Sequence, residues 1–225
     1  MKQRRFDNEV PQIINASESH MALVFLLDVS GSMKGRAIQS LNEGLERFKQ
    51  EVCEDRQTRE ILDVAIIQFN DQFEVIQDFV PIEYMESIEL QADGGTKYSE
   101  PIREALYLVN ERSRFYRRSG SEPFKPWIIM ITDGAPTDDI TDVAYEVEEM
   151  QDKGKVRFIA LGVGEYDPKP LKQITDVVFR MDGTNFSAFF DWVGKSMRSV
   201  SQSAPGEKAP LPQLEGNVYR DVSDI

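Results

Sequence analysis

A set of oxygen-bearing side chains follows an apolar run near the start of the chain. In the stretch LLDVSGSM, residues 26–33, Asp28 is followed by Ser30 and Ser32 at alternate positions, with Gly31 between the serines. All three side chains are small, and neither serine is a strong nucleophile without a base beside it. The stretch is compatible with a metal site, with the first motif of an enzyme, or with a polar turn.

Two further stretches carry oxygen donors at comparable places. Asp133 ends a second apolar run and is followed by Gly134, and Thr96 follows two glycines just ahead of a predicted helix. In a parallel α/β sheet, ligands bind at the carboxyl ends of the strands. We therefore expect Asp28 and Asp133 to lie at the same end of the sheet, with the Thr96 hydroxyl at the entrance of the helix.

Together these segments supply two carboxylates and three hydroxyls, from Asp28, Asp133, Ser30, Ser32 and Thr96. Such hard oxygen donors suit Mg²⁺, Ca²⁺ or Mn²⁺ rather than zinc or copper. We predict a divalent cation site, with Mg²⁺ favoured and Ca²⁺ or Mn²⁺ as alternatives. Two carboxylates roughly neutralise a divalent ion, which would keep affinity for one more anionic ligand, such as an Asp or Glu of a partner protein.

The elements that must position these residues alternate between strand-like and helix-like patterns. Nearly continuous apolar runs predict buried strands, with a shorter last one, at 21–29, 61–69, 126–134, 156–164 and 177–182. The mixed polarity of 73–82, with Pro81, predicts an antiparallel edge strand. Helical apolar stripes separate the strands. The prediction is an α/β fold: a doubly wound, mostly parallel six-stranded sheet with one antiparallel edge strand and helices on both faces.

The chain divides into three predicted parts. Residues 1–19 are an N-terminal arm, residues 20–200 are one folded domain, and residues 201–225 are a flexible tail that contains three prolines. Two alternatives for the tail are an arm packed on the domain and a docking peptide for a partner.

Composition limits the classes of function. The 225 residues include 26 basic and 39 acidic side chains, a net charge of −13, which argues against nonspecific binding to nucleic acid or to an anionic membrane. One cysteine, Cys53, excludes an internal disulfide, and one histidine, His20, leaves almost nothing for a His-based triad or a His-rich zinc site. The start MKQRRFDNEVPQ lacks a following signal-type apolar stretch, so we expect a cytoplasmic location.

The three motifs, in this order, resemble the metal-ion-dependent adhesion site (MIDAS) of von Willebrand factor type A (VWA) domains. DVSGS carries Asp28, Ser30 and Ser32, GGT carries Thr96, and ITDG carries Asp133. The resemblance covers roughly residues 20–200 and implies a VWA/Rossmann-like fold. Within the family, the chain is similar to bacterial cytoplasmic tellurite-resistance proteins of the TerY type, which are associated with a protein phosphatase and a kinase in stress-response systems.

The resemblance implies a role for each site residue. Ser30 and Ser32 would ligate the metal directly, and Thr96 would do so directly or through water. Asp28 and Asp133 would act largely through bound waters and would hold the serines in place. The family has no catalytic nucleophile at these positions, and the sequence offers none. The implied function is a metal-dependent protein–protein interaction module, not an enzyme.

Two other functions remain as alternatives. The protein could be a scaffold that uses its basic loop, predicted at 112–125, or its tail, with a purely structural metal. It could also be a metal-dependent phosphatase of the haloacid-dehalogenase type, but that class needs a second acid two residues after the first, where this chain has Ser30.

Charged residues near the predicted site and far from it complete the list of candidates. The rim of the site, or its partner contacts, would include Lys34, Asp138, Asp139 and Glu165; the aspartates are also suited to capping the next helix. A second docking surface at the opposite end of the sheet would use Arg114, Phe115, Tyr116, Arg117 and Arg118, unless these charges only compensate a helix C-terminus.

Overall fold

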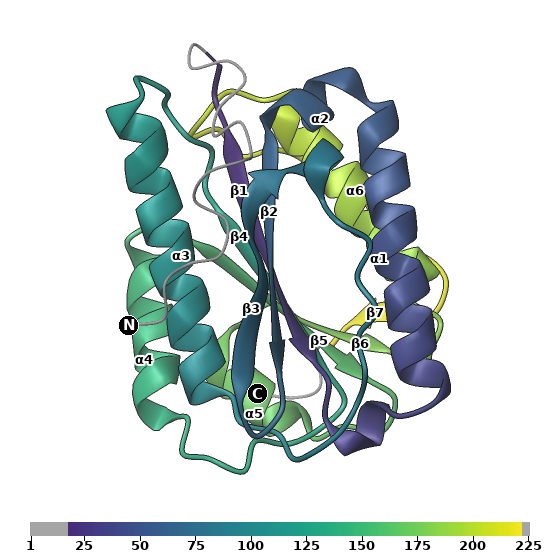
Figure 1. Ribbon diagram of the computed structural model, residues 1–225. Helices are drawn as coiled ribbons and strands as arrows, with labels where there is room; N and C mark the ends of the chain where they lie inside the picture. Colours follow the sequence, from purple (N-terminus) through teal and green to yellow (C-terminus); the bar gives the residue numbers. More distant parts are fainter. Residues whose placement is uncertain (1–17, 222–225) are drawn as a thin grey trace.

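The computed structural model describes residues 18–221 and shows one sheet between two layers of helices (Figure 1). The strands are β1 (Met21–Asp28), β2 (Leu62–Phe69), β3 (Phe73–Pro81), β4 (Trp127–Thr132), β5 (Arg157–Val163), β6 (Val178–Met181) and β7 (Val218–Arg220). The helices are α1 (Arg36–Glu54), α2 (Arg56–Ile61), α3 (Ser99–Arg118), α4 (Thr141–Asp152), α5 (Pro168–Ile174) and α6 (Ser187–Ser201), with short 3-10 turns at Gly31–Met33 and Ile82–Tyr84.

The sheet has the strand order β3-β2-β1-β4-β5-β6-β7. The five inner strands are parallel, while β3 pairs antiparallel with β2 and β7 pairs antiparallel with β6. The predicted doubly wound α/β class is therefore confirmed. The sheet has seven strands rather than the predicted six, and an antiparallel strand lies at each edge.

The additional strand comes from the segment predicted as a tail. Val218 pairs with Met181 of β6, and its side chain is buried. Earlier in the same segment, the indole Nε1 of Trp192 on α6 donates to the carbonyl oxygen of Pro212 at 3.0 Å. Leu211 packs against the core. Up to Asp221 this segment lies along the domain. The predicted N-terminal arm, 1–19, falls outside the described residues except for its last two.

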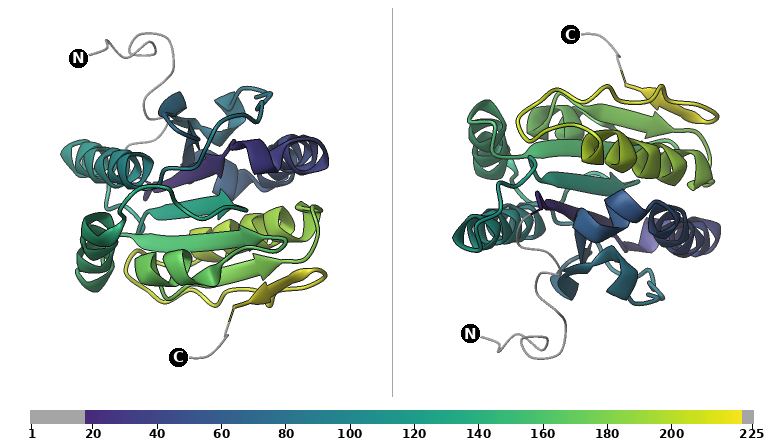
Figure 2. Two further views of the ribbon diagram at one scale, coloured as in Figure 1. Left: turned by 90° about the horizontal axis from the view of Figure 1, so that it is seen from below. Right: turned by 90° about the horizontal axis from the view of Figure 1, so that it is seen from above.

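Each face of the sheet is covered by its own set of helices, as the end-on views in Figure 2 show. Helices α1 and α6 cover one face and α3, α4 and α5 the other, because the side chains of each strand alternate between two separate buried clusters. Strands covered on both faces are apolar along their whole length, which is why β1 and β4 are fully buried.

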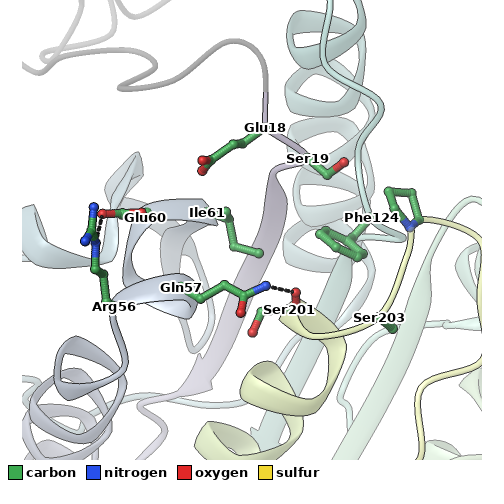
Figure 3. A pocket seen from close by; sticks show the side chains of 10 residues that line it. Glu18, Ser19, Arg56, Gln57, Glu60, Ile61, Phe124, Ser201 and Ser203 are labelled. Atoms are coloured by element: carbon green, nitrogen blue, oxygen red, sulfur yellow. Dashed lines mark hydrogen bonds and ion pairs between the residues drawn. The ribbon is translucent and has the colours of Figure 1, made fainter.

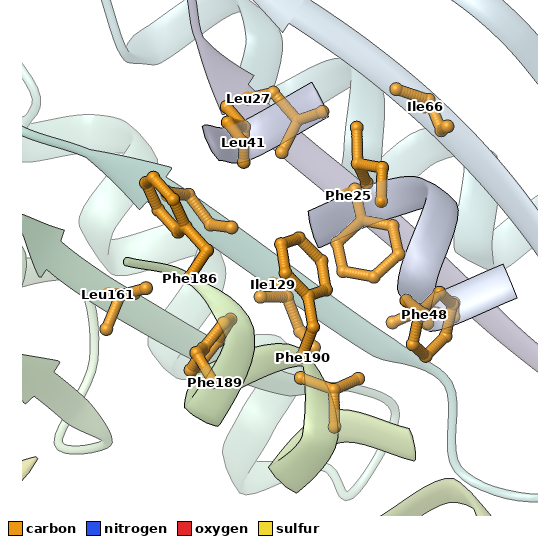
Figure 4. Close-up of a cluster of buried hydrophobic side chains, with 14 of the residues drawn as sticks. Phe25, Leu27, Leu41, Phe48, Ile66, Ile129, Leu161, Phe186, Phe189 and Phe190 are labelled. Atoms are coloured by element: carbon orange, nitrogen blue, oxygen red, sulfur yellow. The ribbon is translucent and has the colours of Figure 1, made fainter. Parts of the chain in front are cut away.

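Helices α1 and α6 approach each other closely over an aromatic cluster (Figure 4). The rings of Phe25 and Phe48 lie 5.3 Å apart edge to face, and Phe190 of α6 lies 5.7 Å from Phe25. Gly44 of α1 makes this approach possible, because a Cβ there would lie 2.4 Å from the Phe190 ring.

At the amino end of the sheet, the short helix α2 contacts both α1 and α6. The side-chain amide of Gln57 donates to the carbonyl oxygen of Ser201 at the end of α6 at 2.6 Å, across a pocket shown in Figure 3. No helix within residues 18–221 is long and apolar enough to span a membrane.

Substitution by alanine should have opposite effects at the two helical glycines of this interface, Gly44 of α1 and Gly194 of α6. Gly44→Ala should lower the free energy of unfolding by about 1–3 kcal/mol, because the new methyl overlaps a buried ring that has no room to move. In Gly194→Ala, the nearest atoms would lie 3.7 Å away, so the gain in helix propensity should leave stability equal or higher by about 0.5–1 kcal/mol. Urea denaturation of both variants measures the difference, and equal losses would contradict the packing argument.

Candidate metal centre

The site begins with a buried carboxylate at the end of β1. Asp28 is fully buried, its Oδ1 accepts from the backbone N–H of Ser30 at 2.7 Å, and its Oδ2 accepts from Thr132 Oγ1 at 2.5 Å. Burial raises the pKa of Asp28 to about 6, against the lowering effect of these hydrogen bonds, and the nearby Asp133 carboxylate adds to the rise. All the direct contacts of this carboxylate are neutral donors, so a bound cation would compensate its buried charge.

The two serines continue from Asp28 toward the surface. Ser30 Oγ lies 3.0 Å from Ser32 Oγ, and Ser32 Oγ donates to Asp133 Oδ1 at 2.6 Å. Ser30 is buried, whereas Ser32 is exposed and Asp133 is half-buried. Burial also raises the pKa of Asp133. Hydrogen bonds therefore link the side-chain oxygens of DVSGS and ITDG into one continuous network, although the two motifs lie more than 100 residues apart in the sequence.

Thr96 approaches the same place on a glycine loop. Gly94 has φ +80°, and its carbonyl oxygen accepts from the backbone N–H of Gly31 at 2.9 Å, which ties the loop to DVSGS. A Cβ added at Gly134 would lie 3.1 Å from Thr96 Oγ1, so the Thr96 hydroxyl lies against the segment that follows Asp133. The three motifs are thus adjacent in space.

Three residues that the sequence analysis did not select support this arrangement. Thr132 bonds to Asp28, and the buried Tyr98 donates from its hydroxyl to the carbonyl oxygen of Gly134 at 2.5 Å. Asp71, in the turn between β2 and β3, accepts from the backbone N–H of Gly95 at 2.7 Å. A polar residue at the end of an apolar strand was the available signal for Thr132.

The predicted rim residues have separate roles. Lys34 and Asp93 form an exposed ion pair at 2.8 Å. Asp138 accepts from the backbone N–H groups of Tyr98 and Ser99, both at 2.9 Å, and so caps α3 rather than the following helix.

Of the other two rim candidates, one caps a helix and one is exposed. Asp139 accepts from the backbone N–H of Thr141 at 2.9 Å and caps α4 as expected. Glu165 is exposed in the turn after β5.

The predicted second docking surface changes in one important respect. Tyr116 is fully buried and donates to Asp63 of β2, beside the Arg112–Asp63 ion pair at 2.7 Å, so it cannot anchor a partner. Phe115 is half-buried, and the three exposed arginines lie on the last turns of α3 rather than in a loop: Arg114, Arg117 and Arg118. They do lie at the end of the sheet opposite Asp28, because α3 runs antiparallel to the strands (Figure 1).

The chemistry of the donor set fits a hard divalent cation. Ser32 Oγ lies 3.0 Å from Ser30 Oγ and 2.6 Å from Asp133 Oδ1, and such short spacings suit oxygens that share one small ion. Within residues 18–221 no three His, Cys, Asp or Glu side chains are grouped to hold a metal, so hydroxyl donors are essential to this site. The residues present therefore fit Mg²⁺, Ca²⁺ or Mn²⁺.

A doubly wound α/β domain with oxygen donors at the carboxyl ends of β1 and β4 defines the class of this protein. The profile of the von Willebrand factor type A domain matches residues 22–191, and the chain belongs to that family. Domains of this family are metal-dependent adhesion and protein-interaction modules. A search of curated proteins gives no match.

Solved structures show the same fold at low sequence identity. The pilus adhesin SpaC from Lactobacillus rhamnosus GG has 15% sequence identity and a TM-score of 0.66. The match covers 80% of this chain and 30% of the adhesin. The vWF domain of the type V pili tip protein Mfa5 from Porphyromonas gingivalis has 12% identity and a TM-score of 0.63, and the match covers 84% of this chain and 98% of that domain. Proximal thread matrix protein 1 from the mussel byssus, solved with a zinc-occupied MIDAS motif, has 20% identity and a TM-score of 0.56. The match covers 84% of this chain and 46% of that protein. The chain thus spans less than half of the adhesin and of the byssus protein.

The buried carboxylate predicts a stability cost in the absence of metal. The pKa of Asp28 is raised in the folded state from 3.8 to about 6, so the free energy of unfolding falls as the pH rises between these values, by about 3 kcal/mol. In EDTA near neutral pH, Asp28→Asn should be more stable than the wild type by up to that amount. The advantage should shrink on acidification. Urea denaturation across the pH range measures it, and parallel pH curves for the two proteins would contradict the assignment.

Asp71 predicts an indirect effect on metal affinity. Asp71→Ala removes the acceptor that fixes Gly95 beside Thr96, so the divalent-ion affinity should fall by about 10–100-fold without loss of a ligand. Isothermal titration with Mg²⁺ measures it. Gln72→Ala, an exposed neighbour in the same turn, is the control, and an equal effect of both substitutions would exclude a specific role for Asp71.

Proposed function

We propose that this domain recognises a protein partner through a divalent cation held by the three motifs, with a carboxylate of the partner completing the coordination. The observation that carries the proposal is that the hydrogen-bonded side chains of the site run from the core to the surface. Asp28 and Ser30 are buried, whereas Ser32 is exposed. The oxygens anchored in the core therefore end at the surface, where a partner can reach them.

The charges of the donor set support a carboxylate ligand. Ser30, Ser32 and Thr96 would hold the ion through neutral hydroxyls, while Asp28 and Asp133 balance its charge and orient the serines. When bound, the cation supplies a Lewis-acidic position that an anionic oxygen can occupy. Asp28 is fixed by two hydrogen bonds and is inaccessible, which argues against its use as the nucleophile of a phosphatase.

The identity of the ion is part of the proposal. Hard oxygen donors fit Mg²⁺, Ca²⁺ and Mn²⁺, and of these we propose Mg²⁺ as the bound ion, with Ca²⁺ and Mn²⁺ as alternatives. A structural relative from the mussel byssus carries zinc in its MIDAS motif, so zinc belongs in the same titrations.

The cellular setting is also proposed. The resemblance of DVSGSMKG and ITDGAPTDD to TerY-type proteins supports a role in a bacterial, cytoplasmic, tellurite-resistance-like stress response. An associated phosphatase or kinase would be the partner. The similarity of the fold to the pilus adhesin SpaC and to the pili tip protein Mfa5 supports adhesion as the competing role.

Removal of the two serine hydroxyls tests the site. Ser30→Ala/Ser32→Ala should abolish the rise in melting temperature on addition of Mg²⁺ and should abolish capture of the partner from the native cell extract. Ser40→Ala, on α1 outside the site, should leave both unchanged. Capture should also be lost in EDTA.

The same experiment separates recognition from scaffolding. A partner that is captured equally in Mg²⁺, in EDTA and by the double variant, while only the melting temperature responds to metal, would assign the ion a purely structural role. Absence of any metal response in the wild type would overturn the site itself.

A further inference from the structure

A basic groove lies at the end of the sheet opposite the metal centre. It is a cavity of about 430 Å³ between the C-terminal ends of α3 and α4 and the loop that precedes β4. We define the basic groove by its five cationic lining residues: Arg114, Arg117, Lys125, Lys153 and Lys155. Glu122 is the one carboxylate among its lining residues. This concentration of positive charge is unexpected in a chain with a net charge of −13.

Three of the five cations form no ion pair within residues 18–221, although the pKa of the Glu149 carboxylate is lowered by its bond to Lys153 and also by the nearby charge of Lys155. Arg114 pairs with Glu111 at 2.7 Å and Lys153 with Glu149 at 2.6 Å, both on the surface of their own helices. Arg117, Lys125 and Lys155 form no ion pair or side-chain hydrogen bond with any residue in 18–221. Compensation of a helix C-terminus accounts for Arg117 but not for Lys125, which lies in the loop before β4.

The groove continues into a second cavity of about 380 Å³ and shares three lining residues with it: Phe124, Lys125 and Gly206. In the second cavity the guanidinium of Arg157 lies 4.7 Å over the ring of Trp127. The Nε of Arg157 is buried and has no hydrogen-bond partner within the described residues. Arg157 therefore adds a positive side chain to the lining of the second cavity, and none of the described residues accepts from its Nε.

Apolar side chains accompany the charges in both cavities. Phe124, Met150 and two prolines line the first, and Trp127, Val200 and Leu211 line the second. Aromatic and aliphatic surface beside arginine is the composition of a protein-docking site rather than of a site for a bare anion.

The pocket in Figure 3 provides a comparison at the same end of the domain. Its cavity is larger, about 590 Å³, but its charges are of both signs, and Arg56 is already paired with Glu60 at 2.8 Å. That pocket therefore has no preference for one sign of ligand charge, in contrast to the basic groove.

We infer that the basic groove binds an acidic peptide segment of a protein partner, with acidic side chains at the lysines and arginines and an apolar side chain against Phe124 or Trp127. The overall charge of −13 repels long polyanions such as nucleic acid, whereas a short acidic segment meets mainly the local positive field. The groove and the metal centre lie at opposite ends of the sheet, so this second interaction does not depend on the metal.

Selection from a random dodecapeptide display library tests the inference. The full chain is the bait, in EDTA so that the metal centre does not contribute. Lys125→Glu/Lys155→Glu serves for counter-selection, because both side chains are free of internal pairs and their replacement should leave the fold intact. Lys169→Glu/Lys195→Glu carries the same change in net charge on exposed residues outside the groove.

The inference expects enriched peptides that combine Asp or Glu with an aromatic or aliphatic residue. Their affinity should fall at least about tenfold in the groove variant, weaken with added salt, and hold within about twofold in the control variant. Equal binding to both variants, or no enrichment of acidic sequences, would overturn it. Tighter binding of single-stranded DNA than of any selected peptide would reassign the groove to nucleic acid. Concentration-dependent self-association lost in the groove variant would make a second copy of the chain the occupant.

Discussion

Asp28 is a carboxylate without solvent contact at the end of an inner strand, and the surrounding structure is arranged to tolerate it. Its two oxygens accept from Ser30 and Thr132, so β1 and β4 are linked at the point where each strand ends. The linkage aligns the DVSGS and ITDG segments, and hydrogen bonds continue from Ser30 through the exposed Ser32 to the half-buried Asp133. Folding without a cation leaves a buried charge uncompensated. Metal binding and the stability of this end of the domain are therefore coupled.

The order and class of the main elements could be predicted because strands covered on both faces and amphipathic helices have strong patterns. The three motifs could be selected for the same reason, since DVSGS and ITDG lie at the ends of such strands and GGT lies just before such a helix. Two short elements, β7 and α2, were not predicted. The three-residue β7 lies in a proline-containing segment and exists through pairing with β6, and the six-residue α2 depends on its cap at Asp55, which accepts from the backbone N–H of Thr58 at 2.9 Å.

Side-chain contacts between distant segments were also beyond the reach of sequence patterns. Tyr116 was predicted at the surface because it stands among arginines, but Asp63, a polar residue within β2, draws both Arg112 and Tyr116 inward. The basic groove could not be predicted for the same reason, because it also depends on contacts between distant segments. Its cations come from α3, from the loop before β4 and from the region after α4, and only the packing of these helices brings them together.

The antiparallel strands at the two margins of the sheet have a consequence for association between molecules. An uncovered strand offers a row of unpaired backbone groups to any other chain. Here one margin ends in Pro81, which has no N–H to donate, and the other is the three-residue β7 with Arg220 at its end. The segment after α6 thus protects the flank of β6. Cleavage before Val218 would open that flank and favour aggregation through intermolecular strand pairing, even though the metal centre lies in other strands.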